Sequence, residues 1–344
     1  MFHRPEELRP VPSLAALFGI RGTDQLLRDY RTVASHFFSR DKFIVGLSSA
    51  GLLRPDLSLP AYAGLVPKDG IAPIFNFFDR VGGGFGFRQA VTRNTCRDWR
   101  GGRLSYDEHD GTDFVCPPGT PLVAAAPGVV VAARDSWLRG GLTVCVDHGE
   151  GVVTQYTHCS KQVAEIGQPV QRGEVVAVSG SAGIDMTQFF PWVPPHVHFM
   201  VWVRGWPVDP YLAEGELTRP GVWFHGNEPR TAKGPLPDDP TPLALDDVAV
   251  HEDAIERAIA LCKDERIRKE IESAKSPASR VAILEDSLHH DRDAWPDEAR
   301  SLRFRPRAQP QKVRLTLPLP HSIYRGAKAA DSPFTKPRPR PAKS

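Results

Sequence analysis

Two valine-rich runs joined by a polar turn make up the segment Leu142-Thr-Val-Cys-Val-Asp-His-Gly-Glu-Gly-Val-Val-Thr-Gln-Tyr156. Its centre, from Asp147 to Gly151, is typical of a hairpin turn, and valine favours extended strands. Further runs of this kind lie at 122–133, 174–178 and 197–203. No helical apolar period separates them, so the sequence predicts a mainly β fold with an antiparallel β-sheet core. His148 lies inside the turn, and we expect it to be exposed to solvent.

The chain of 344 residues is longer than one ordinary domain needs, and composition divides it into five parts. We expect an N-terminal accessory region at 1–85, the β domain at 86–213, a Pro-rich linker at 214–244, a small C-terminal helical appendage at 245–302 and a basic Pro-rich tail at 303–344. A helix capped by Thr23 is predicted to run to Arg40. In the appendage, apolar residues from Ile255 to Ile271 lie near one helical face, and Ser276-Pro277 is typical of the start of a second helix.

Charge is nearly balanced over the whole chain, with 43 basic and 41 acidic residues, but it is uneven along it. From Arg303 to Ser344 the sequence has eleven basic residues and one acidic residue. The balance excludes a uniformly basic protein that coats nucleic acid, and we expect no specific nucleic-acid partner. The tail is polar and rich in proline, so it is predicted to be disordered. It is expected to be either a solvated terminus or a cationic arm that binds an anionic wall polymer, phospholipid headgroups or nucleic acid.

Apolar runs are too short for a transmembrane helix, which needs about 18 residues. The run Leu14–Ile20 is also too short for the apolar part of a signal peptide. The N-terminus therefore gives no sign of export, which leaves a cytoplasmic location open. The five cysteines form no CxxC pair, which excludes a four-cysteine zinc site.

Histidines cluster with one aspartate inside the β domain. Residues i and i+2 of a strand face the same side, so His196 and His198 can reach one site. His109 and Asp113 are four residues apart, which also puts them on one side in a strand or a helical turn. Imidazole and carboxylate ligands suit zinc, and three protein ligands leave a position for water in a catalytic site. Each motif alone is weak, but their coincidence in one domain favours a metal site.

The order of short motifs in this region resembles the lysostaphin/LytM-type zinc metallopeptidase family. The resemblance covers roughly residues 86–213. It is carried by Gly86-Phe-Arg88, His109-xxx-Asp113-Phe114, Pro118-Gly-Thr-Pro121, Ala125-Ala-Pro-Gly-Val-Val130, Asp147-His-Gly-Glu-Gly151, Tyr156-Thr-His158, Val170-Gln-Arg-Gly-Glu174, Ser179-Gly-Ser-Ala-Gly183, Pro195-His-Val-His-Phe199 and Pro207-Val-Asp-Pro210.

Carried over residue by residue, the resemblance implies one Zn²⁺ per chain with His109, Asp113 and His198 as ligands. His158 and His196 match the family's two active-site histidines that do not bind the metal. The resemblance implies a zinc metalloendopeptidase that hydrolyses peptidoglycan cross-bridge or stem peptides, located in the periplasm or outside the cell. All five residues are present, whereas family members that only activate other enzymes have lost some of them.

Two alternatives to this function stay open. The first is a catalytically silent binding or activator module that has kept the fold. The second is an intracellular zinc peptidase with a substrate other than the wall. The sequence indicates neither the oligomeric state nor whether a segment of the chain blocks the groove.

The chain departs from the family between Gly183 and His196, where it is about seven residues longer than we expect. This loop is predicted to border the groove, either lining it with Phe189, Phe190 and Trp192 or packing these rings against the N-terminal region. Met200 follows the His-Val-His-Phe motif where relatives often have glutamate. Outside the site, His289 and His290 are expected at the surface of the second appendage helix.

Overall fold

The computed structural model describes residues 2–11, 13–27, 30, 53–76, 109–137, 140–208, 210, 230–291, 294–306, 309 and 312–330. Gly86-Phe-Arg88 and most of the helix predicted up to Arg40 lie outside these ranges, although residues 23–27 are helical. In the described part, no helix has both the length and the apolar character needed to cross a membrane.

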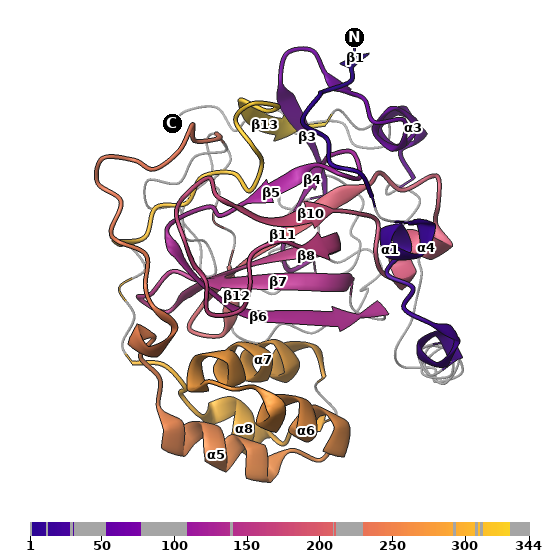
Figure 1. Cartoon of the computed structure of the whole chain (residues 1–344). Helices are drawn as coiled ribbons and strands as arrows, with labels where there is room; N and C mark the ends of the chain where they lie inside the picture. The colour runs from indigo at the N-terminus through magenta and orange to yellow at the C-terminus, as the bar shows by residue number, and fades with distance from the viewer. Residues whose placement is uncertain are drawn as a thin grey trace, which may run out of the picture.

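An 11-stranded sheet occupies the centre of the molecule, and its main path runs β13-β3-β4-β11-β8-β7-β6-β9 (Figure 1). β10 pairs with β5 and β8, and β12 pairs with β11. All pairs are antiparallel except β3 with β13. The bounds are β3 Ile71–Asn76, β4 Thr112–Val115, β5 Pro121–Val123, β6 Gly128–Ser136, β7 Gly141–Asp147, β8 Val152–Gln162, β9 Pro169–Val170, β10 Val175–Ser179, β11 His196–Val203, β12 Trp206–Val208 and β13 Gly326–Ala329. The predicted mainly β fold is confirmed.

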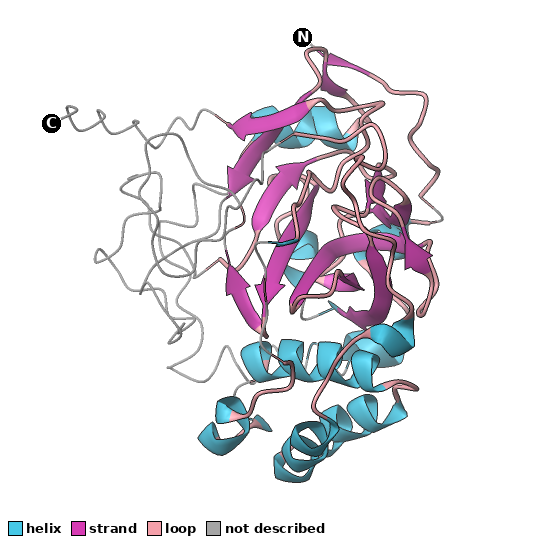
Figure 2. Cartoon of the chain, turned by 90° about the vertical axis from the view of Figure 1, so that its left-hand side faces the viewer, coloured by secondary structure: helices cyan, strands magenta, loops and turns pink. Residues whose placement is uncertain are grey.

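The period-two alternation of the strands separates two apolar cores. On β11, Phe199 and Val201 belong to one core, whereas Met200 and Trp202 belong to the other. The second core lies between the sheet and the C-terminal helices, which cover one side of the sheet (Figure 2). His196 and His198 have the parity of Met200 and Trp202, so they lie on the face that the helices cover.

The C-terminal helices are α5 Glu252–Leu261, α6 Glu265–Ser273, α7 Pro277–His290 and α8 Asp297–Ser301, preceded by the 3-10 turn η3 Leu245–Asp247. The single helix predicted from Ile255 to Ile271 is wrong, because Cys262 adopts an extended conformation and Asp264 caps a new helix by accepting from the backbone N–H groups of Arg266 and Ile267. The predicted start of the next helix is confirmed, since the Ser276 hydroxyl accepts from the N–H of Ser279.

The predicted disorder of the tail is wrong for its described first part. Leu315, Leu317 and Leu319 are almost fully buried in the first core, and β13 adds to the sheet edge beside β3. Arg305 is also buried, where it binds Asp147 and Glu285. The composition of this segment indicated that it could not fold alone. In the structure it is ordered because it packs against the central sheet. Residues 331–344 lie outside the described part.

The N-terminal region is also more closely joined to the β domain than its predicted boundary implies. β3 pairs with β4, with Ile74 opposite Phe114. The remaining N-terminal elements are β1 Phe2–His3, paired with β2 Val66–Pro67, and the helices α1 Leu14–Phe18 and α3 Pro55–Tyr62.

The longer loop before β11 contains the short helix α4 Ile184–Gln188 and packs on this N-terminal region. The Phe190 ring lies 5.2 Å from that of Phe18 and 4.9 Å from that of Tyr62, measured between centroids. Phe190 nevertheless stays partly at the surface, and Phe189 and Trp192 are exposed as well. The loop therefore packs on the N-terminal region through one face of Phe190, while all three rings remain accessible to solvent.

Candidate metal centre

Strand register places the first two candidate ligands face to face. Asp113 of β4 is the direct partner of His198 on β11, and directly opposed side chains of an antiparallel pair lie close together. The Oδ1 atom of Asp113 lies 2.8 Å from Nδ1 of His198. Both side chains are buried.

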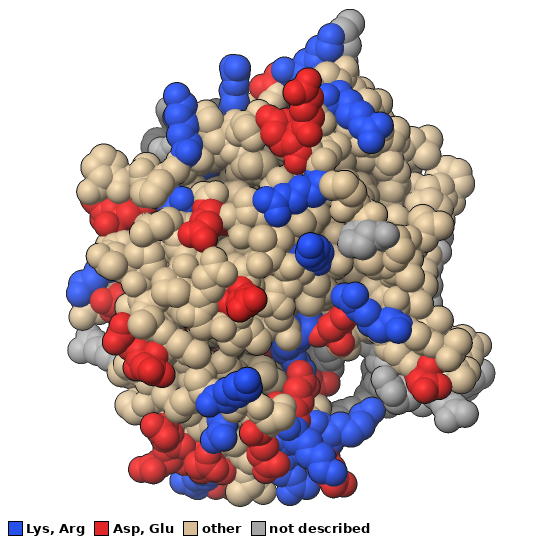
Figure 3. Space-filling model, viewed as in Figure 1, with Lys and Arg blue, Asp and Glu red and all other residues tan. Residues whose placement is uncertain are grey.

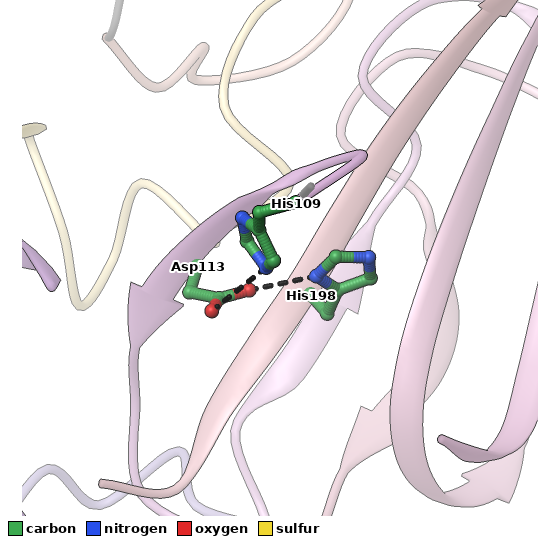
Figure 4. A group of neighbouring side chains, drawn as sticks. All are labelled: His109, Asp113 and His198. Atoms are coloured by element: carbon green, nitrogen blue, oxygen red, sulfur yellow. Dashed lines mark hydrogen bonds and ion pairs between the residues drawn. The ribbon is translucent and has the colours of Figure 1, made fainter. Parts of the chain in front are cut away.

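His109 completes a group of three. Its Nε2 atom lies 3.1 Å from Oδ2 of Asp113, and its ring centroid lies 4.6 Å from that of His198. Each residue offers one ligand atom, and these three atoms all lie within 4.8 Å of one another (Figure 4). Two imidazole nitrogens and one carboxylate oxygen at this separation fit a zinc ion.

Gly111, between His109 and Asp113, allows this close approach. A Cβ atom there would lie 2.8 Å from Cε1 of His198 and 2.8 Å from the main-chain oxygen of Phe199. A side chain at this position would therefore push β11 away from the loop that carries His109.

His158 and His196 lie next to this group. Their ring centroids are 4.7 Å apart, and that of His158 lies 5.9 Å from that of His198. Nδ1 of His158 lies 2.6 Å from the carbonyl oxygen of Ala182, and Nδ1 of His196 lies 2.7 Å from that of Pro194. A carbonyl only accepts, so Nδ1–H donates in both rings, and the neutral rings keep their lone pairs on Nε2.

The backbone at His158 is strained. Its φ angle is 63°, a left-handed conformation that a residue with a side chain rarely adopts. The His158 N–H donates to the carbonyl of Gly140 at 3.0 Å, and Gly140 itself has a φ of 76°. Such strain persists where the surrounding structure holds it and is frequent at functional sites.

Electrostatics favour a cation in this group. Burial opposes the charged form of His198, but its contacts with Asp110 and Asp113 outweigh burial and raise its pKa to about 10. Burial likewise raises the pKa of Asp113, but the His109 and His196 imidazoles more than offset this and hold it well below the ordinary value. Burial lowers the pKa of His196 to about 4, which keeps this ring neutral near pH 7.

The profile of peptidase family M23 matches residues 107–210, the segment that holds all five of these residues. The chain contains a peptidase M23 domain. The M23 domain is of metallopeptidase type, and it occupies less than a third of this chain.

Relatives of the M23 domain include cell-wall enzymes. Peptidoglycan DD-endopeptidase ShyA of Vibrio cholerae is 39% identical over 101 residues, which are 29% of this chain and 22% of ShyA. The DD-carboxypeptidase/endopeptidase Mpg of Neisseria gonorrhoeae is 32% identical over 145 residues, 41% of this chain and 29% of Mpg. The chain thus spans under a third of the length of these relatives.

A solved structure also matches part of the chain, with a low TM-score. The catalytic domain of lysostaphin from Staphylococcus simulans is 30% identical, with a TM-score of 0.26, and the match covers 30% of this chain and 76% of that one.

Asp110, which the sequence did not single out, adjoins the three candidate ligands. Its Oδ1 atom lies 3.1 Å from Nε2 of His198. Its Oδ2 atom lies 3.2 Å and 2.9 Å from Nε2 of His289 and of His290. The expected surface position of these two α7 histidines is therefore wrong for His289, which is buried, and His290 is only partly exposed. About 180 residues separate them from Asp110, so no short motif in the sequence predicts this contact.

His148 also differs from its expected exposure. It is buried, with Nδ1 2.9 Å from the carbonyl oxygen of Pro127 and Nε2 2.8 Å from the hydroxyl of Thr154. These two hydrogen bonds connect the β7–β8 turn to Pro127 and to β8. His148 therefore stabilises the turn and is not part of the metal centre.

Proposed function

We propose that this protein is a zinc-dependent metalloendopeptidase that hydrolyses peptide bonds of peptidoglycan, in the cross-bridge or the stem peptide. The observation that carries the proposal is the convergence of His109, Asp113 and His198 on one point, with His158 and His196 beside them.

One zinc ion would be held in this centre by His109, Asp113 and His198. The donor set fits the ion, and the raised pKa of His198 reflects a position between two carboxylates where positive charge is stabilised. When bound, zinc supplies a Lewis acid for the scissile carbonyl and lowers the pKa of bound water toward about 7.

The two other histidines would handle protons. A neutral His196 with its lone pair on Nε2 is suited to accept the proton of the attacking water. His158, in the same tautomer, would then stabilise the developing charge or, once protonated, donate to the leaving amine. The carbonyls of Pro194 and Ala182 hold the two rings in these orientations.

The substrate is proposed from the relatives' names, which include peptidoglycan DD-endopeptidases. The DD cross-links of stem peptides are therefore the first bonds to test. A wall substrate implies a periplasmic or extracellular location.

Digestion of purified sacculi tests this proposal. Wild-type protein should release soluble muropeptides, and the new termini in these fragments identify the bond that is cut. The His196→Gln variant is the matched control and should release almost none. Intact sacculi after incubation with folded, zinc-loaded wild-type protein would contradict the proposed substrate.

The basic tail is proposed to bind an anionic wall polymer through its last residues. Arg305, Lys312 and Arg314 form ion pairs within the protein. The four cations after Ala330, at 336, 338, 340 and 343, are proposed to bind the polymer. A Coulombic attraction weakens with salt, since the Debye length is about 8 Å at physiological ionic strength. Truncation after Ala330 should therefore reduce sacculus binding at low salt only, measured by co-sedimentation. Equal binding of both proteins at every salt concentration would exclude the role.

A further inference from the structure

A second group of metal-ligand side chains lies next to the three proposed zinc ligands, and two of its three members lie outside the segment that matches the family. It consists of Asp110, before β4, and His289 and His290 at the end of α7, and we call it the α7 cluster. Its three ligand atoms lie within 4.8 Å of one another, as those of the first group do. The distances from Oδ2 of Asp110 to the two Nε2 atoms are 3.2 Å and 2.9 Å.

These distances suit ligands of one cation. Ligands at about 2.0–2.2 Å from a tetrahedral zinc ion are a little over 3 Å apart. The corresponding distances among His109, Asp113 and His198 are 3.1 Å and 2.8 Å, so in both groups the ligand atoms would need to move apart by only a few tenths of an ångström to hold the ion. The α7 cluster therefore has the spacing of the group that the M23 match supports.

The surroundings of His290 point to a cation at its Nε2 atom. Nδ1 lies 3.0 Å from the main-chain oxygen of Asp286 and 3.1 Å from its Oδ1, so Nδ1–H donates there. A neutral imidazole has only one N–H, so Nε2 then presents a lone pair, yet it faces the Asp110 carboxylate at 2.9 Å. A second proton on the ring or a metal ion bound by both atoms removes this conflict, and only a metal ion can be shared with Nε2 of His289. An imidazole oriented by a carboxylate on its far side is the usual arrangement of metal-binding histidines.

Burial strengthens the need for positive charge. Asp110 is only 7% exposed, and its recorded ion pairs in the described part of the chain are with histidines. A buried carboxylate is costly unless it is paired or binds a metal. The Asp286 carboxylate has its own partner, the guanidinium of Arg134. Trp202 packs edge-on against both rings and limits their movement, with centroids at 5.0 Å and 5.8 Å.

We propose that Asp110, His289 and His290 bind a second divalent transition-metal ion of the zinc type. The two carboxylate oxygens of Asp110 then have different partners. Oδ2 binds the second ion, and Oδ1 accepts a hydrogen bond from Nε2–H of His198. The ion fastens α7 to the loop that enters β4. It thereby holds the partner that orients His198 toward the first site.

The number of zinc ions bound by the full chain tests this proposal. Stripped protein is titrated with Zn²⁺ against a chromogenic chelator, and native mass spectrometry counts the ions. Wild type should bind two equivalents tightly. The His289→Gln/His290→Gln variant should bind one, and His109→Ala/His198→Ala should also bind one. The control His251→Gln, which removes an exposed histidine elsewhere, should bind two.

Milder variants guard against loss of the fold. His290 is partly exposed, so His290→Gln should keep the wild-type near-UV circular dichroism spectrum while the second equivalent binds at least tenfold more weakly. Asp110→Asn, which keeps the side-chain shape, should do the same. One equivalent in wild type, or two tight equivalents in folded His290→Gln and Asp110→Asn, would overturn the proposal. The count of ions does not depend on whether the protein cleaves peptidoglycan.

Discussion

His198 has a carboxylate oxygen at each ring nitrogen, Asp113 at Nδ1 and Asp110 at Nε2. A neutral imidazole can donate to only one of them, so the ring must either carry a second proton or bind a cation. The first alternative explains its raised pKa, and the second makes it a metal ligand with Nε2–H directed to Asp110. This single residue thus joins the electrostatics of the site to its proposed chemistry.

Loss of a ligand and loss of a proton-transfer group should have different effects. We expect His198→Ala to lose the zinc of the first site together with activity, because one of three protein ligands is removed. His158→Gln and His196→Gln should keep that zinc but lose about 10²–10⁴-fold in kcat. Metal analysis and sacculus digestion on the three variants make the comparison. Near-normal rates in both glutamine variants would show that these two histidines serve packing alone.

His148 should make stability depend on pH. Burial lowers its pKa from the ordinary 6.5 to about 4, so the unfolded chain takes up the proton more readily. Its contribution to stability is complete above pH 6.5 and is lost as the pH falls toward 4. The free energy of unfolding of His148→Gln, measured by urea denaturation from pH 4 to 7, should therefore fall less on acidification than that of wild type. Parallel curves would contradict this assignment.

At the residue scale, the sequence could predict contacts set by a strand. His196 and His198 are two apart, and the structure places both on one face of β11 together with Asp113 of the neighbouring strand. It could not predict the contact of Asp110 with His289, because that contact depends on how α7 packs across the sheet. The turn at His148 was recognised, but its burial depends on Pro127, which lies 21 residues away.

At the element scale, the sequence predicted those strands and helices whose apolar pattern or start signal was not obscured by neighbouring residues. Alternating valines indicated the strands, and Ser276-Pro277 indicated the start of α7. In the tail, alternation of Leu315, Leu317 and Leu319 was also present, but prolines and positive charge concealed it. Their burial depends on the sheet face that they cover, and composition alone contains no information on that face.

Two truncations should therefore differ sharply in stability. Ending the chain after Leu302 removes β13 and the buried Leu315, Leu317, Leu319, Ile323 and Tyr324. Each such side chain contributes about 1.5–3 kcal/mol when fully buried, so the loss is comparable with a typical net stability of about 5–15 kcal/mol. We expect that protein to be unfolded or aggregated in circular dichroism and gel filtration. Ending it after Ala330 should leave the melting temperature nearly unchanged, and equal melting temperatures for both would contradict the packing.

At the scale of the whole molecule, a buried ion network joins three distant parts of the chain. Arg305 of the tail binds Asp147 of β7 at 2.6 Å and Glu285 of α7 at 2.9 Å. The M23 domain, the C-terminal helices and the tail thus each contribute one side chain to a single buried ion network. The face in Figure 3 shows acidic and basic side chains interspersed at the surface, where such pairs are screened by water.

Loss of this centre should be costly. Arg305→Met leaves two buried carboxylates without their guanidinium and should lower the free energy of unfolding by about 3–5 kcal/mol. The control Arg257→Met breaks a pair with Glu298 in which both side chains are at least half exposed, and should cost about 0–1 kcal/mol. Urea denaturation of both variants measures the difference. Equal, small effects would show that the network does not hold the parts together.

The measurement that tests the central claim most directly is the metal dependence of sacculus digestion. Wild-type protein stripped with a chelator should release no muropeptides, and one equivalent of Zn²⁺ at the first site should restore release. His198→Ala should remain inactive at the same zinc concentration. Undiminished release by the stripped wild type, or zinc-restored release by His198→Ala, would contradict a metallopeptidase centre at His109, Asp113 and His198.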